Sequence, residues 1–212
     1  MQQQTIITID DHPLFRKGLA DLIEMDDSLT LIGEAASGEQ GLELALQYQP
    51  DLILLDINMK TISGLETLRA LKAHDIESRV IMLTVSDNEE DVIDAIRAGA
   101  DGYLLKDMEP EDTLASIRAA AEGRLVVSER LTRLLAEALR AEAKAPASVQ
   151  GAGLTTREIE ILDLVSQGLS NKHIARQLFI SPATVKVHMK NLLKKLQLNS
   201  RVEAAVWYLK NQ

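Results

Sequence analysis

The chain contains no cysteine among its 212 residues. Disulfides and thiolate metal sites are therefore excluded, and the absence fits a reducing compartment. Aromatic residues are scarce, with one Trp, three Tyr and two Phe, so we expect an aliphatic core. No apolar run approaches the roughly 20 residues of a membrane span, and the first residues lack the pattern of a signal peptide. These absences predict a cytoplasmic protein without a membrane partner.

Charge is divided unevenly along the chain. Residues 151–212 carry nine Lys/Arg and four Asp/Glu, a net charge of +5, whereas residues 1–150 carry 14 and 28, a net charge of −14. A basic end on an acidic body suggests that the end binds a polyanion. The alternative is a chance division of solvated surface charge.

Over residues 1–123, five apolar segments alternate with five amphipathic ones. The predicted strands are residues 5–10, 29–34, 51–56, 79–84 and 101–105. Such alternation predicts an α/β fold with a parallel sheet covered on both faces, and five strands most often take the doubly wound, flavodoxin-like order 2-1-3-4-5. The run before Asp56 is apolar throughout, so periodicity alone does not exclude a buried helix there.

The rest of the chain has a different pattern. Residues 124–153 are predicted to be a linker that contains a helix at 128–143, because Pro, Gly, Ser and Ala follow that helix. Residues 154–212 read as four helices, with Ser181-Pro182 opening the third. Two short helices joined by a tight turn are typical of a helix-turn-helix. We therefore predict domains at 1–123 and 154–212.

Three acids are predicted to meet at the point where the strand order reverses. Asp10 and Asp11 follow the first strand, and Asp56 ends the third. Mutually repelling carboxylates need a cation, and an all-oxygen site favours Mg²⁺. Thr84 and Lys106 end neighbouring strands and could hold a phosphoryl group on a carboxylate nucleophile. Taken singly, Asp56 could be an ordinary turn residue, Thr84 an ordinary strand end and Lys106 a surface residue.

Residues 4–123 resemble the receiver domains of two-component response regulators. The resemblance implies that Asp56 accepts a phosphoryl group, and that Asp10, Asp11, Asp56 and the backbone carbonyl of Asn58 hold Mg²⁺. It also implies that Lys106 binds the phosphoryl group and that Thr84 and Tyr103 act as switch residues. Two positions depart from the usual receiver pattern, Lys60 and Asp107, where many receivers have proline. His12 is interpreted as a loop or helix-start residue rather than a ligand.

The third helix of the C-terminal region has a core face and a basic face. Val185, Met189, Leu192, Leu193 and Leu196 share the predicted buried side. Lys186, Lys190 and Lys194 form a stripe elsewhere, with Val187, Thr184 and His188 near it. A helix of this kind in a helix-turn-helix enters the DNA major groove. The alternative is a solvated lysine face.

Three segments, at 154–158, 168–172 and 181–188, resemble the LuxR type of DNA-binding domain, so the whole chain resembles the NarL/FixJ class of response regulators and, within it, the nitrate/nitrite-responsive members. The resemblance implies base contacts by Lys186, Val187 and Lys190, and further DNA contacts by Lys172, Thr184, His188 and Lys194. The implied partners are a sensor histidine kinase, promoter DNA and a second copy of the chain on DNA. RNA polymerase is a further candidate. The resemblance also implies that the unphosphorylated receiver masks the recognition helix.

In the last helix, Val202, Ala205, Val206 and Leu209 are predicted to face the core. Ala204, Trp207 and Tyr208 then lie toward the other side, where we expect a dimer contact. The alternative is that Trp207 only packs on its own domain.

Two other functions fit parts of the pattern. A Mg²⁺-dependent phosphohydrolase would also use a strand-terminal Asp, but such enzymes usually have a second Asp two residues later, where this chain has Asn58. A DNA-binding protein whose receiver only docks a partner would not need the acidic pair, yet Asp10 and Asp11 are both present. A regulator rather than an enzyme is therefore predicted.

Overall fold

A computed structural model of the protein describes residues 3–74, 76, 78–85, 88–124, 126, 146 and 148–211. The chain divides into two compact units, Met1–Glu122 and Gly123–Gln212. The predicted helix at 128–143 lies outside the described residues.

The first unit is built on a five-stranded parallel sheet in the order β2-β1-β3-β4-β5. The strands are β1 Gln4–Ile9, β2 Leu29–Ala35, β3 Leu52–Asp56, β4 Arg79–Thr84 and β5 Gly102–Leu105. β3 lies between β1 and β4 and is buried at all five positions. The predicted fold class and strand order are confirmed, and the apolar run before Asp56 is a central strand rather than a helix.

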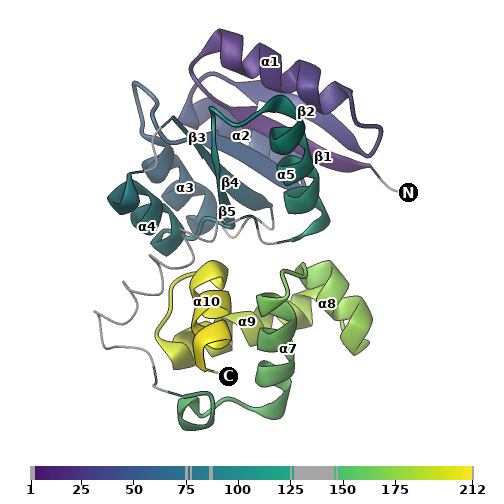
Figure 1. The fold of residues 1–212 in the computed structure, drawn as a ribbon, viewed down its shortest axis with the longest axis vertical. Coiled ribbons are helices and arrows are strands. Elements are labelled where there is room, and N and C mark those ends of the chain that lie inside the picture. Colours follow the sequence, from purple (N-terminus) through teal and green to yellow (C-terminus); the bar gives the residue numbers. More distant parts are fainter. Residues whose placement is uncertain are drawn as a thin grey trace. The chain divides into compact units, whose positions relative to one another are not determined.

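Four helices connect these strands and a fifth follows β5: α1 Pro13–Glu24, α2 Gly38–Tyr48, α3 Gly64–Ala73, α4 Glu89–Arg97 and then α5 Pro110–Glu122. α1 lies beside α5, while α2 lies beside α3 and α3 beside α4. The two groups cover opposite faces of the sheet (Figure 1). This doubly wound arrangement leaves the carboxyl ends of β1 and β3 open to form a site between them.

Local sequence signals determine where several helices begin. Ser63 and Glu66 form a complete capping box at α3, with the Ser63 side chain accepting from Glu66 N and the Glu66 side chain accepting from Ser63 N. At α2, the Ser37 side chain accepts from Gln40 N, but the Gln40 side chain accepts from Ala36 N instead of closing the box. The caps satisfy amide groups that otherwise lack partners at helix starts.

The second unit is helical. After the short 3-10 helix η1 Gln150–Ala152 come α7 Thr156–Ser166, α8 Asn171–Leu178, α9 Pro182–Leu196 and α10 Arg201–Asn211. Complete capping boxes at Thr155 and Glu158, and at Ser200 and Glu203, begin α7 and α10. The α8–turn–α9 segment is the predicted helix-turn-helix (Figure 1). Among the described helices, none is long and apolar enough to cross a membrane.

Candidate metal centre and nucleic-acid interface

The acidic pocket lies at the carboxyl end of the sheet. Asp10 directly follows β1, Asp56 is the last residue of β3, and Lys106 directly follows β5. The backbone fixes these positions, because Asp10 N donates to Ala35 O at 3.0 Å and Lys106 N donates to Thr84 O at 2.7 Å. The sheet thus brings together side chains that are up to 96 residues apart in the sequence.

Lys106 joins two of the predicted carboxylates. Its Nζ lies 2.6 Å from Asp10 Oδ2 and 2.9 Å from Asp56 Oδ2, and all three side chains are at most 7% exposed. The ammonium also lies 4.6 Å from the centre of the Phe15 ring, which adds a cation–π contact. Lys106 is therefore a buried part of the pocket rather than a surface residue.

Asp56 is held in an environment that disfavours its charge. Burial raises the pKa of the Asp56 carboxyl, and the Asp10 carboxylate adds to this rise against the opposing effect of Lys106. Asp56 Oδ1 accepts from Asn58 N at 3.2 Å, while Oδ2 is paired with the Lys106 ammonium at 2.9 Å. Asp11 Oδ1 is buried without a hydrogen-bond partner among the described residues, and three carboxylates share the pocket with the Lys106 ammonium, so the residues present fit a bound divalent ion.

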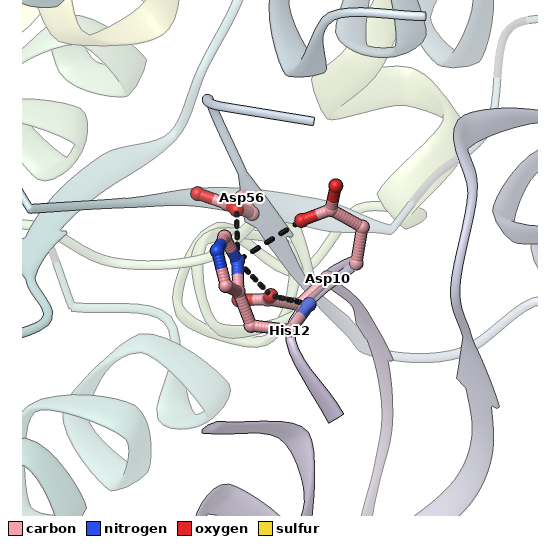
Figure 2. A group of neighbouring side chains, drawn as sticks. Asp10, His12 and Asp56 are labelled. Carbon is pink, nitrogen blue, oxygen red and sulfur yellow. Dashed lines mark hydrogen bonds and ion pairs between the residues drawn. The ribbon is translucent and has the colours of Figure 1, made fainter. Parts of the chain in front are cut away.

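His12 and Asp11 complete the pocket. His12 Nδ1 lies 2.9 Å from Asp11 Oδ1, 3.3 Å from Asp10 Oδ1 and 3.8 Å from Asp56 Oδ2. Figure 2 shows the imidazole ring turned toward Asp10 and Asp56. Asp11 Oδ2 also accepts from the backbone N of Lys60 at 3.2 Å, which joins the β1–α1 and β3–α3 loops. The donor atoms of Asp10, Asp11, His12 and Asp56 all lie within 4.8 Å of one another.

The two predicted switch residues lie on adjacent strands. Thr84 and Tyr103 are 2% and 8% exposed. Tyr103 pairs with Met82 in the β4–β5 register, two residues before Thr84. Because side chains alternate along a strand, Thr84 and Tyr103 point to the same face of the sheet.

In the helical unit, α9 has the predicted core face. Val185, Met189, Leu192 and Leu196 are buried, and Leu193 is half-buried against the same core. Ser181 caps the helix by accepting from Thr184 N at 3.0 Å. On other sides of α9, Lys190 and Lys194 are exposed, Lys186, Thr184 and His188 are half-buried, and Val187 is 58% exposed. Lys172, on α8, is exposed as well.

Not every lysine of α9 is available to a ligand. Lys195 Nζ lies 2.7 Å from an oxygen of Glu158, which is 3% exposed. Burial alone would raise the pKa of Glu158, but hydrogen bonds from Lys195 and Thr155 outweigh it, so this pKa is lowered. Lys195 therefore holds α9 against α7, whereas its neighbour Lys194 faces solvent.

Comparison with known proteins identifies both units. The chain matches the response regulator receiver domain family over residues 6–118 and the luxR family of bacterial regulatory proteins over residues 152–208. The chain belongs to the response regulators with a LuxR-family DNA-binding domain. As a response regulator of this family, it is a phosphorylation-activated, DNA-binding transcription regulator, as predicted.

Individual relatives of this response regulator match along nearly all of their length. It is 54% identical over 203 residues to the nitrate/nitrite response regulator protein NarL of Escherichia coli K12, covering 96% of this chain and 94% of that protein. It is 47% identical over 208 residues to NarP of the same strain, covering 98% and 95%. The solved receiver domain of the putative response regulator NarL from Mycobacterium tuberculosis is 31% identical, with a TM-score of 0.56 over 58% of this chain and 100% of that one.

In α10 of the response regulator, Val202, Ala205 and Val206 are buried as predicted, but the predictions for Leu209 and for the opposite side of the helix are wrong. Ala204, Trp207 and Tyr208 are at most 8% exposed and belong to the core of the helical unit, whereas Leu209 is 53% exposed. Trp207 Nε1 donates to the carbonyl oxygen of Pro146 at 3.0 Å. The alternative, in which Trp207 packs on its own unit, is confirmed. The proposed dimer contact through these three residues loses its basis, because a contact surface has to be solvent-exposed.

Two features of the pocket were not predicted from the sequence. At Gly64, a Cβ would lie 1.9 Å from the carbonyl oxygen of Asp56. His12 is the N-cap residue of α1, in agreement with its interpretation as a loop or helix-start residue, but its ring also contacts the carboxylates. Adjacency to Asp11 was the one signal for His12, and it did not separate a ligand from a helix-start residue.

Proposed function

We propose that Asp56 is the phospho-acceptor of this response regulator. An oxygen of its carboxylate attacks the phosphorus of a phosphohistidine on a sensor kinase, the phosphorus–nitrogen bond breaks, and the electron pair returns to the kinase imidazole. Lys106 offsets the negative charge on the transferred group, and Thr84 donates a hydrogen bond to it. The single observation that supports this most is the buried Asp56 carboxylate at the end of β3, 2.9 Å from the Lys106 ammonium.

We further propose that Asp10, Asp11, Asp56 and the backbone carbonyl of Asn58 hold Mg²⁺. When bound, the ion would neutralise charge on the phosphoryl oxygens as they approach Asp56. Support comes from the excess of carboxylates over cations among the described pocket residues and from the buried oxygen Oδ1 of Asp11, which accepts no hydrogen bond from a described residue. Asp10 positions Lys106, and Asp11 holds the β3–α3 loop through Lys60 N.

For the helical unit, we propose that α9 enters the major groove of promoter DNA. Lys186, Val187 and Lys190 would contact bases, with Lys172, Thr184, His188 and Lys194 nearby and mainly on phosphates. The solvent-facing positions of Lys190, Lys194 and Val187 support this assignment. Binding as a homodimer and contact with RNA polymerase belong to the same proposal, with the dimer surface unassigned.

We propose that the upstream signal is nitrate or nitrite. Support comes from the relatives NarL and NarP, which are named as nitrate/nitrite response regulators and match nearly the whole chain. The kinase that delivers the phosphoryl group would then sense one of these anions.

The phosphorylation proposal is tested by comparing wild type, Asp56→Asn and a matched Asp51→Asn control. Asp51 directly precedes the same strand at its opposite end and accepts from Thr5. With acetyl phosphate and Mg²⁺, wild type and Asp51→Asn should gain phosphate in intact-mass measurements, and their DNA affinity should rise about tenfold. Asp56→Asn should do neither. Equal phosphate uptake by Asp56→Asn would refute the assignment.

The DNA interface is tested with two adjacent lysines. Lys194→Gln should weaken binding to selected operator DNA and lower the slope of log K against log salt by about 1, as expected for one lost phosphate contact. Lys195→Gln should leave this slope unchanged, because Lys195 is bound to Glu158. The same slope for both variants would contradict the proposed orientation of α9.

A further inference from the structure

His12 lies where a cation would be expected. Its Nδ1 is between 2.9 and 3.8 Å from oxygens of Asp10, Asp11 and Asp56. Helix capping does not account for this orientation, because His12 is the N-cap residue of α1 but its side chain makes no capping hydrogen bond. The ring is instead directed into the pocket (Figure 2).

The contacts around His12 have the geometry of ligands rather than of hydrogen-bonded partners. Asp11 Oδ1 is 2.9 Å from His12 Nδ1, yet this oxygen accepts no hydrogen bond of good geometry from any described residue. Asp56 Oδ2, from a side chain that is 1% exposed, lies 3.8 Å from His12 Nδ1 and 2.9 Å from the Lys106 ammonium. Donor atoms that lie close together but do not point at one another are expected where all of them point at a shared ion.

The ligand set determines which ion is favoured. Carboxylate and carbonyl oxygens suit Mg²⁺, Ca²⁺ and Mn²⁺, whereas an imidazole nitrogen suits Zn²⁺, Ni²⁺ and Cu²⁺. An imidazole added to three carboxylates therefore changes the selectivity of the pocket. His12 is 60% exposed, so an arriving ion can reach its ring from solvent.

We propose that His12 is a nitrogen ligand of the pocket, so that this response regulator binds d-block divalent ions such as Ni²⁺ and Zn²⁺ in competition with Mg²⁺. The proposal rests on the proposed function in one respect, namely that the carboxylates of this pocket hold a divalent ion. It adds a second class of ion at the same site, with Asp11 and Asp56 as shared ligands.

The test is isothermal titration of the full chain with Ni²⁺, Zn²⁺ and Mg²⁺, in wild type, His12→Gln and His12→Phe. The matched control is His74→Gln, because His74 is exposed at the end of α3. Loss of a ligand should weaken Ni²⁺ and Zn²⁺ binding by about 10- to 100-fold in both His12 variants, with little change for Mg²⁺. The control should match wild type. Co²⁺ provides a direct readout, since its bound form should give a hyperfine-shifted imidazole resonance that both His12 variants lack.

Two results would overturn the proposal. If His12→Gln and His12→Phe bind all three ions more tightly by the same factor, His12 merely supplies positive charge that competes with any cation. If Ni²⁺ and Zn²⁺ affinities match those of wild type, His12 is not a ligand. A wild-type chain that binds Ni²⁺ through His12 but does not bind Mg²⁺ would support this inference and refute the magnesium part of the proposed function, so the two are separable.

Discussion

Replacing Gly64 by alanine should displace Asp56 without changing any charged group of the pocket. A Cβ on Gly64 would lie 1.9 Å from the carbonyl oxygen of Asp56 and 2.7 Å from the Cα of Ile57, whereas real Cβ contacts are essentially never shorter than 3.0 Å. Both neighbours are backbone atoms, so no side-chain rotation relieves the overlap. The end of β3 or the start of α3 has to move by about 1 Å.

Two magnitudes follow from this displacement. Overpacking of this kind costs about 1–3 kcal/mol of the free energy of unfolding. A reacting group misplaced by about 1 Å can lose about 10²-fold in rate, so phosphorylation of Asp56 should slow by up to that factor. Gly18→Ala is the matched control, because Gly18 lies within α1 with nothing within 4 Å of its Cβ position. That change should stabilise the chain by about 0.5–1 kcal/mol.

The assay combines urea unfolding, followed by circular dichroism, with the initial rate of phosphate uptake from acetyl phosphate. Trp207 is the chain's one tryptophan and lies in the core of the helical unit. Its fluorescence transition should therefore remain at the wild-type urea concentration in Gly64→Ala, which localises the defect to the receiver. The reasoning is refuted if Gly64→Ala phosphorylates as fast as Gly18→Ala and unfolds at the same urea concentration.

Three further outcomes are expected. The pKa of Glu158 is lowered on folding, so its ionisation stabilises the chain above its ordinary pKa, and this contribution is lost as pH falls through the lowered pKa. Lys195→Gln should flatten that loss, measured as the midpoint of the Trp207 fluorescence transition in urea at each pH. Trp207→Phe removes the hydrogen bond to Pro146 and should lower stability by about 1–3 kcal/mol in thermal circular dichroism, whereas Leu209→Ala at an exposed position should change it by less than about 0.5 kcal/mol. The pKa of Asp56 is raised, so its ionised form opposes folding above that pKa, and in metal-free buffer at neutral pH Asp56→Asn should have a higher Tm than wild type. Adding Mg²⁺ should narrow the difference in Tm, because the ion stabilises the folded state of the chain that binds it. A lower Tm for Asp56→Asn without metal would contradict the reasoning.

The parts of the fold that were predictable depend on short-range signals. β3 is an unbroken apolar run between two acids, and the caps at Ser63, Thr155 and Ser200 need only a residue three positions away. The strand order then followed from the alternation of strands and helices. Because parallel strands end at a common edge, the order alone placed Asp10, Asp56 and Lys106 near one another.

The parts that were not predictable depend on contacts between distant segments. α10 is buried at every position from Val202 to Tyr208, so helical periodicity could not reveal which side was exposed. Lys194 and Lys195 are neighbours with the same chemistry, and only the position of Glu158, 37 residues earlier, separates their roles. The requirement for glycine at position 64 arises from the approach of two backbone segments, for which no residue pattern exists.

The charge balance of the pocket explains why Lys106 is well placed to respond to phosphorylation. Its ammonium is shared between Asp10, at 2.6 Å, and Asp56, at 2.9 Å, in a site where the side chain is 7% exposed. A phosphoryl group carries about −1.5 to −2 charges at neutral pH, so on Asp56 it would compete with Asp10 for the same ammonium. Lys106 directly follows β5, and its backbone N donates to Thr84 O. Movement of the Lys106 side chain would therefore shift the end of β4, which holds Thr84, and β5, which carries Tyr103.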